Sequence, residues 1–164
     1  MRIAFLLALP LSLLAAACGF SPLYAPSAGG GAPVIGPVIV DEVPGKSGYE
    51  LKSELDKLFD VERGSGAAHR LSIKISEAVA GVGFRVDESA SRSDLTLNAT
   101  YTLYDVGGAR VLTGRAASVA SYDIASSAYA EITAQDDART RAAQELAEKI
   151  RSQIALRLAS AKAP

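Results

Sequence analysis

The sequence predicts an α+β fold: a two-layer sandwich in which two helices cover one face of a four-stranded mixed sheet, in the order β-α-β-β-β-α. Two segments carry apolar residues at helical spacing, and between them three consecutive segments alternate apolar and polar residues as half-buried strands do. A short β-branched run precedes the first helix. This strand–helix–strand opening allows a parallel crossover, which makes the predicted sheet mixed.

The first strand is expected to end with the β-branched run Val38–Val40, before the turn signal Pro44-Gly45, and to start a little earlier, at Val34 or Ile35. Pro37 lies inside this window and has no amide hydrogen to donate to a neighbouring strand. The first strand therefore belongs at an edge of the sheet or beside a bulge.

The first helix is expected from about Gly48 to Asp60. Ser47 and Glu50 have the spacing of a capping box, in which the Ser47 hydroxyl accepts from the Glu50 amide and the Glu50 carboxylate accepts from the Ser47 amide. The apolar stripe of this helix consists of Leu51, Leu55, Leu58 and Phe59. We expect that stripe to face the sheet.

The second and third strands differ in length. Arg70–Glu77 alternates strictly, and a loop rich in glycine, serine and charged residues is expected over Gly81–Ser93. A longer alternating run follows that loop. Its inward side chains are Leu95, Leu97, Ala99, Tyr101 and Leu103. We expect this third strand to lie over the core.

The fourth strand returns after a hairpin signal at residues 105–108, Asp-Val-Gly-Gly. It is expected over Ala109–Tyr122. Gly114 in its middle indicates a bulge or a close approach of another group to the backbone.

The last segment, from about Tyr129 to Ser160, predicts a long helix. Ser127 or Thr133 is the candidate cap, and Asp136 and Asp137 suit an early position because the helix dipole favours acidic residues there. The apolar stripe consists of Ala143, Leu146, Ala147, Ile150, Ile154 and Leu158. This stripe predicts a second helix packed on the sheet.

The face of the sheet opposite the helices is polar and mostly uncharged. Such a face is either wet or a surface for a partner. Its candidate partner-contacting residues are Thr96, Asn98, Thr100 and Thr102, together with Tyr129 near the start of the last helix. Arg85 and Arg92, in or beside the loop between the second and third strands, are candidates for an anionic lipid head group, because arginine grips phosphates by paired hydrogen bonds.

Catalytic chemistry is not evident in the sequence. The single histidine, His69, lies at a loop–strand junction, where an exposed residue is expected. No serine, aspartate and histidine suggest a triad, and no cluster has metal-ligand spacing. Gly81-Val82-Gly83 lacks the strand-to-helix context of a phosphate-binding loop. The sequence therefore indicates a binding protein without cofactors rather than an enzyme.

The N-terminal segment has the layout of a secretory signal peptide. Met1-Arg2 precedes an apolar run over Ile3–Leu14, and a small-residue stretch ends at Cys18. This ending resembles the lipobox of bacterial lipoproteins, with Ala15 where leucine is usual, and implies that Cys18 carries a lipid. An ordinary signal peptide cut elsewhere, with Cys18 a buried thiol, is the alternative.

The expected organisation is a signal peptide over residues 1–17, a lipidated N-terminus and Pro/Gly-rich tether over 18–37, and one domain over 38–164. Removing residues 1–17 leaves 147 residues (164 − 17), with 16 basic (17 − 1) and 18 acidic side chains. That balance argues against nucleic acid, which requires a basic face. The Gly29–Gly31 run and its flanking prolines predict a tether that is partly loose and partly stiff.

The element order and the segment Cys18-Gly19-Phe20-Ser21-Pro22-Leu23-Tyr24 resemble the lipopolysaccharide-assembly lipoprotein family, LptE, in its alphaproteobacterial form. Further likeness lies at the end of the fourth strand, Ala120–Asp123, and in the last helix at Arg141–Ala143 and Leu146–Ile150. The resemblance implies a non-enzymatic, outer-membrane lipoprotein facing the periplasm. In that family the lipoprotein sits in the LptD β-barrel, assists assembly of the lipopolysaccharide (LPS) translocon and contacts LPS.

Two alternatives remain open at this point. One is an auxiliary lipoprotein of an ABC-type lipid transport system, and the other is a periplasmic enzyme or solute-binding domain. Gly19 directly after the cysteine is not the aspartate that retains enteric lipoproteins in the inner membrane. This difference favours the outer membrane.

Overall fold

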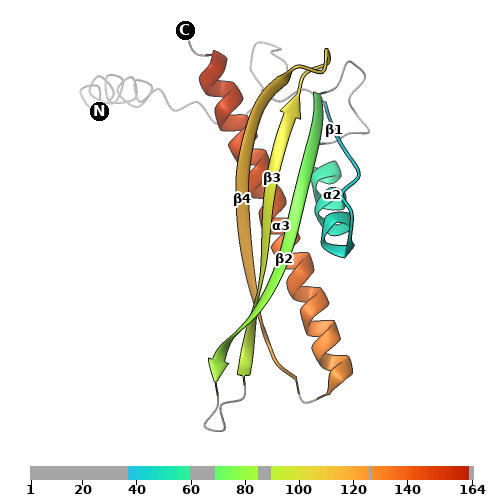
Figure 1. Ribbon diagram of the computed structural model, residues 1–164, viewed down its shortest axis with the longest axis vertical. Coiled ribbons are helices and arrows are strands. Elements are labelled where there is room, and N and C mark those ends of the chain that lie inside the picture. Colours follow the sequence, from blue (N-terminus) through green and yellow to red (C-terminus); the bar gives the residue numbers. More distant parts are fainter. Residues whose placement is uncertain (1–36, 60–68, 85–89, 126, 163–164) are drawn as a thin grey trace, which may run out of the picture. The chain divides into compact units, whose positions relative to one another are not determined.

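The computed structural model describes residues 37–162 apart from 60–68, 85–89 and 126. The described elements lie in the compact unit Val34–Pro164. They are β1 (Val38–Val40), α2 (Lys46–Phe59), β2 (His69–Phe84), β3 (Ala90–Tyr104), β4 (Arg110–Asp123) and α3 (Ala128–Lys162) (Figure 1). Within the described residues no helix is both long and apolar enough to cross a membrane.

The sheet has the strand order β1-β2-β3-β4. β1 pairs parallel to the start of β2, with Val38 opposite His69 and Val40 opposite Leu71, whereas β2, β3 and β4 pair antiparallel. The His69 amide donates to the Pro37 carbonyl at 2.8 Å, and Pro37 has no amide hydrogen of its own to offer. The predicted α+β fold, mixed sheet and edge position of the first strand are confirmed. The expected start of that strand at Val34 or Ile35 lies outside the described residues.

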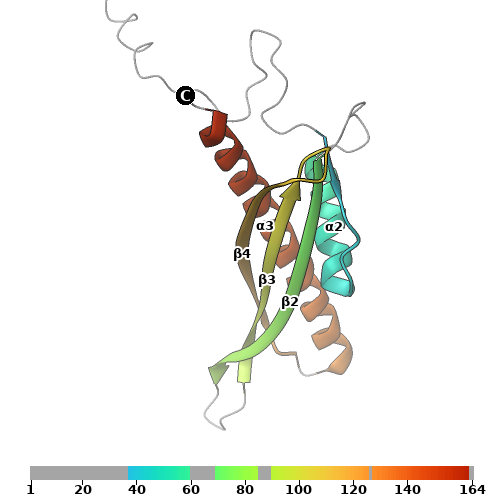
Figure 2. The same ribbon diagram turned by 45° about the horizontal axis from the view of Figure 1, so that its top comes forward.

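The core lies between the sheet and the two helices, which both cover the same face (Figures 1 and 2). The fully buried large side chains come from both helices and from the inward positions of the strands. Among them are Leu51, Leu55, Leu71, Leu95, Leu97, Tyr101, Leu103, Leu146, Ile150 and Ile154. The predicted stripes therefore meet in one core, and burial of their apolar surface is the main force holding the layers together.

The hairpin between β3 and β4 confirms its sequence signal. The Gly108 amide donates to the Asp105 carbonyl at 3.0 Å, and the Ala109 amide donates to Asp105 Oδ1 at 2.8 Å. Gly108 has a φ of 82°, a conformation that glycine adopts without steric cost. Asp105 and Gly108 thus fix this turn.

The predicted loop over Gly81–Ser93 is wrong, because β2 runs to Phe84 and β3 begins at Ala90. Gly81 lies opposite Ser93, and the ladder passes through irregularities at Gly83 and Phe84. Glycine and serine suggested a turn, but pairing along the two strands satisfies their backbone groups in an extended conformation. The irregular register accommodates Gly83 without ending the ladder.

The expected start of α2 needs correction, whereas the start of α3 at about Tyr129 is confirmed to within one residue. α2 begins at Lys46, so Ser47 lies inside its first turn, and the Ser47 hydroxyl donates to the Glu77 carboxylate instead of capping the helix. α3 begins at Ala128, which places Asp136 beyond the first turns that the helix dipole favours for acids. Of the two candidate caps for α3, Ser127 is confirmed: its hydroxyl accepts from the Ala130 amide at 3.2 Å.

Candidate interaction surface and distal pocket

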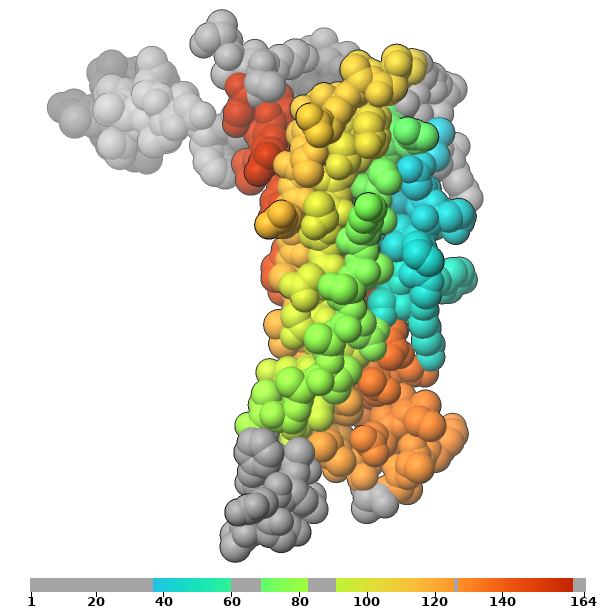
Figure 3. All heavy atoms as spheres, viewed as in Figure 1, coloured from blue at the N-terminus to red at the C-terminus, as the bar shows by residue number. Residues whose placement is uncertain are grey.

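The outer face of the sheet is the face that the helices leave uncovered, and Figure 3 looks onto it. On β3 it presents Thr96, Asn98, Thr100 and Thr102, which are all exposed or half-buried. Their alternation with fully buried neighbours is what a strand over a core dictates. The Thr102 and Thr113 hydroxyls lie 3.3 Å apart, across β3 and β4. This surface is rich in groups that both donate and accept hydrogen bonds.

Two cations interrupt the uncharged outer face at its middle. Thr100 lies opposite Lys74 on β2 and opposite Arg115 on β4, and both basic side chains are exposed. In the described parts of the chain, neither has an acidic partner. Nearer the β3–β4 hairpin, the Arg70 guanidinium lies 5.1 Å from the centre of the Tyr104 ring. The centre of the face is therefore positive.

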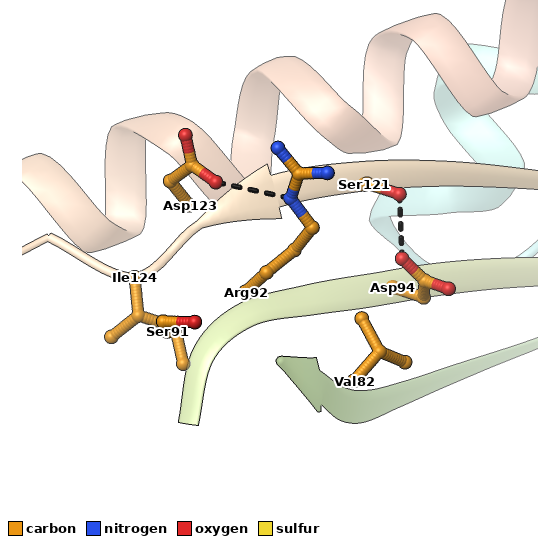
Figure 4. Close-up of a pocket in the computed structure, with 7 residues that line it drawn as sticks. All are labelled: Val82, Ser91, Arg92, Asp94, Ser121, Asp123 and Ile124. Carbon is orange, nitrogen blue, oxygen red and sulfur yellow. Dashed lines mark hydrogen bonds and ion pairs between the residues drawn. The ribbon is translucent and has the colours of Figure 1, made fainter. Parts of the chain in front are cut away.

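An open pocket lies on the outer face where β2, β3 and β4 come together at the end of the sheet away from β1 (Figure 4). Its lining consists of Val82, Ser91, Arg92, Asp94, Ser121, Asp123 and Ile124. Arg92 Nε donates to Asp123 Oδ1 at 3.1 Å, and the Ser121 hydroxyl donates to Asp94 Oδ1 at 2.6 Å. One cation and two carboxylates make this pocket acidic.

The predicted site residues do not all lie where the sequence places them. Arg92 lies in β3 rather than in a loop, and its charge is matched by Asp123. Arg85 and Cys18 lie outside the described residues. Tyr129 is 82% exposed in the first turn of α3, so it does not share the sheet face with Thr96–Thr102. The sequence does not single out Lys74 and Arg115 as head-group residues, because only the strand register reveals that they flank Thr100.

A network of charges joins α2, β2 and α3 on the other face. Arg139, with only 10% of its side chain exposed, donates from Nε and Nη2 to the two carboxylate oxygens of Glu77, each at 2.9 Å. Lys46 Nζ lies 2.6 Å from Asp136 Oδ2, and Arg139 also bonds Asp136. The network ties the start of α2 to the other two elements.

The basic groups of this network lower the pKa values of its two carboxylates, Glu77 and Asp136. Hydrogen bonds from Arg139 hold the pKa of Glu77 below its ordinary value, with a further contribution from the Ser47 hydroxyl. The Lys46 ammonium, and next to it Arg139, lowers the pKa of Asp136. All these charged groups are paired with one another, so the network is better suited to structure than to catalysis.

The described residues contain no cluster of histidine, cysteine, aspartate and glutamate that could hold a metal ion. His69 is half-buried rather than exposed, and its Nδ1 is buried without a hydrogen-bond partner in the part of the chain that the structure describes. Hydroxyl-rich and basic groups on an open face are instead suited to binding an extended partner surface.

A model of the LptE family, described as lipopolysaccharide-assembly, matches residues 35–154. The chain belongs to the LptE family. A lipoprotein structure from Caulobacter crescentus CB15 is 31% identical and superposes with a TM-score of 0.63, over 74% of this chain and 90% of that one. The resemblance stated from the sequence is thus confirmed by a match that spans every strand and both helices as far as residue 154.

Two more distant lipoprotein structures share the fold alone. A minor lipoprotein from Acinetobacter baumannii has a TM-score of 0.56 at 16% identity, over 74% of this chain and 94% of that one. A lipoprotein B from Nitrosomonas europaea has a TM-score of 0.51 at 12% identity, over 74% and 83% of the two chains. Comparison with curated proteins finds no match.

Proposed function

We propose that this protein is an outer-membrane lipoprotein, anchored through a lipid on Cys18 and facing the periplasm. In this proposal it forms a complex with an LptD-type β-barrel and assists assembly of the LPS translocon and insertion of LPS into the membrane. Its role is binding and positioning rather than catalysis. No cofactor takes part.

The observation that carries the proposal is the family match over the whole sheet and most of α3. The uncovered sheet face supports it, because a protein lodged in a barrel needs a broad contact surface. Thr96, Asn98, Thr100 and Thr102 are themselves uncharged and offer hydrogen bonds there. Tyr129, at the start of α3, adds an exposed aromatic anchor of the kind enriched in interfaces.

The anionic groups of LPS require positive charge that is not already neutralised. Lys74 and Arg115, exposed on either side of Thr100, supply it. Arg92 is less suited, because Asp123 and Asp94 lie beside it in the distal pocket. We therefore place the head-group contact at Lys74 and Arg115, with Arg85 as the further candidate between β2 and β3.

Affinity purification of the full chain from detergent-solubilised membranes, with partners identified by mass spectrometry, tests the proposal. We expect an LptD-type barrel as the main partner, and an intact mass that places the N-terminus at Cys18 with added acyl groups. Recovery of inner-membrane ABC components in place of the barrel would favour the auxiliary subunit of an ABC-type lipid transporter.

A further inference from the structure

β4 is the last strand of the sheet, and its outer edge has no paired strand in the described residues. In an antiparallel ladder, alternate residues direct both backbone groups to the same side. The Ile124 amide donates to the Ser91 carbonyl of β3, which assigns the even-numbered residues of β4 to the hydrogen bonds with β3. The odd-numbered residues therefore direct their N–H and C=O groups to the free edge: Thr113, Arg115, Ala117, Val119 and Ser121. An edge this long is a template for pairing with another strand.

Three cations of α3 occupy carbonyls of that edge at regular intervals. Arg141 Nη2 donates to the Ser121 carbonyl at 3.1 Å, Lys149 Nζ to the Ala117 carbonyl at 2.9 Å, and Arg157 Nη1 to the Thr113 carbonyl at 3.0 Å. The cations are eight residues apart, about 12 Å along a helix, and their acceptors four residues apart, about 13 Å along a strand. We call these three side chains the basic ladder.

Residues one helical turn earlier support the ladder. Asp137 pairs with Arg141 at 2.8 Å, and Glu145 pairs with Lys149 at 2.7 Å. At the equivalent position before Arg157, Gln153 accepts from the buried Tyr101 hydroxyl at 2.6 Å. The two acids hold their cations on the helix surface, while the strand carbonyls direct them to the edge.

We infer that the edge of β4 is a strand-pairing surface for a second copy of this chain, and that the basic ladder keeps it closed. The edge is self-complementary about Ala117. Antiparallel pairing of two copies would set Ala117 against Ala117, Arg115 against Val119 and Thr113 against Ser121, with no acidic or basic side chains directly opposed. Val119, which is 51% exposed in the single chain, would become less exposed on pairing.

The ladder opposes this pairing in two ways. It occupies carbonyls that the second copy would need, and it would bring Lys149 against Lys149 and Arg141 against Arg157 across the two-fold axis. Like charges placed together disfavour association. This role of the basic ladder is independent of the proposed function, because it concerns only what keeps the free chain monomeric before another partner binds.

Disulfide trapping in the full-length chain, in membranes, tests the inference. An Ala117→Cys substitution places a thiol at the symmetry centre, where paired strands bring Cα atoms about 5.5 Å apart, a distance that a disulfide spans. With the ladder intact we expect no disulfide dimer. With Arg141→Met, Lys149→Met and Arg157→Met added, we expect trapped dimer to rise at least about tenfold.

Two controls make the result specific. Lys57→Met, Arg70→Met and Arg110→Met remove three exposed cations that do not cap the edge, and should leave the Ala117→Cys chain undimerised. The chain without Ala117→Cys reports any disulfide formed through Cys18. Should the triple ladder variant not fold, Lys149→Met alone, which opens the central carbonyl, should give an intermediate rise. Dimer with the ladder intact, or no rise in whichever ladder variant folds, would overturn the inference.

Discussion

At the scale of single residues, the contact between Tyr101 and Gly114 explains an isolated glycine in a strand. Tyr101 is fully buried, and burial raises the pKa of its hydroxyl. Its ring crosses Gly114, directly opposite on β4, and its hydroxyl reaches Gln153 of α3. A side chain at position 114 would block that path. The sequence suggested a bulge or a close approach, and the structure has the close approach.

Gly114→Ala should therefore destabilise the fold. A Cβ at this position would lie 2.3 Å from the Tyr101 hydroxyl oxygen and 2.4 Å from Cζ, so the buried ring must move. We expect a loss of about 1–3 kcal/mol in the free energy of unfolding, measured by chemical denaturation. In Gly107→Ala the new Cβ meets only Asp105 Oδ1 at 3.4 Å, and the change should stay within about 0.5 kcal/mol. Equal effects of the two substitutions would contradict this account.

The Glu77 carboxylate should make the free energy of unfolding depend on pH in the acidic range. Because its pKa is lowered in the folded state, its contribution is complete above the ordinary glutamate pKa and is lost as pH falls through the lower folded value. Wild-type stability should fall from about pH 4.3 downwards, and Glu77→Gln should lose about 1–3 kcal/mol at pH 7 and flatten that fall. Asp137→Asn, which breaks an exposed pair with Arg141, should cost less than about 1 kcal/mol. A Glu77→Gln pH profile parallel to wild type would refute the prediction.

Charge reversal locates the LPS contact. Lys74→Glu with Arg115→Glu should weaken LPS binding most at low salt, because screening reduces the attraction between exposed charges, and should leave the melting temperature nearly unchanged. Arg85→Glu with Arg92→Glu is the matched pair from the other candidate site. A larger loss in this second pair, measured as LPS binding across salt concentrations, would move the contact to the distal end.

At the scale of elements, apolar periodicity predicts the helices and strands that have one buried face. It misses the strand segments that only backbone pairing holds in place. The stripes of α2 and α3 and the alternation of β3 placed both helices and the sheet correctly, since each has one face in the core. The sequence predicts a loop where the far parts of β2 and β3 pair with each other. There the residues of β2 from Ala78 to Val82 are exposed on both faces, so no alternation marks the strand.

The candidate site was harder to predict than the fold. The solvent-facing threonines of β3 follow from alternation, but the neighbours that give the face its charge depend on register. Lys74 and Arg115 are 41 positions apart in the chain (115 − 74) and lie in one row across the sheet only because both are opposite Thr100. The sequence likewise assigns Asp136 to stabilisation of the helix dipole, whereas in the structure Asp136 forms an ion pair with Lys46 of α2.

α2 should depend on its buried stripe. Leu55 is fully buried, so Leu55→Ala leaves a cavity and should cost about 2–5 kcal/mol of unfolding free energy in urea titration. Leu156→Ala on α3, where the side chain is 56% exposed, serves as the comparison and should cost far less. A Leu55→Ala cost below about 0.5 kcal/mol would mean that α2 does not pack as described.

At the scale of the whole molecule, the helices and the sheet have different roles. Both helices lie on one face and bury the core, which leaves the other face of the sheet free along β2, β3 and β4 (Figures 1 and 3). A domain built in this way can present a rigid surface without exposing its core. We propose that this surface contacts an LptD-type barrel in the outer membrane.

Photo-crosslinking in living cells tests that claim most directly. A benzophenone amino acid replaces Asn98, which is exposed at the centre of the outer face, in the full-length chain. The account predicts that irradiation links position 98 to an LptD-type barrel, identified by mass spectrometry of the adduct. An adduct with inner-membrane transporter components, or no protein adduct from a chain that is folded and in the membrane, would contradict it.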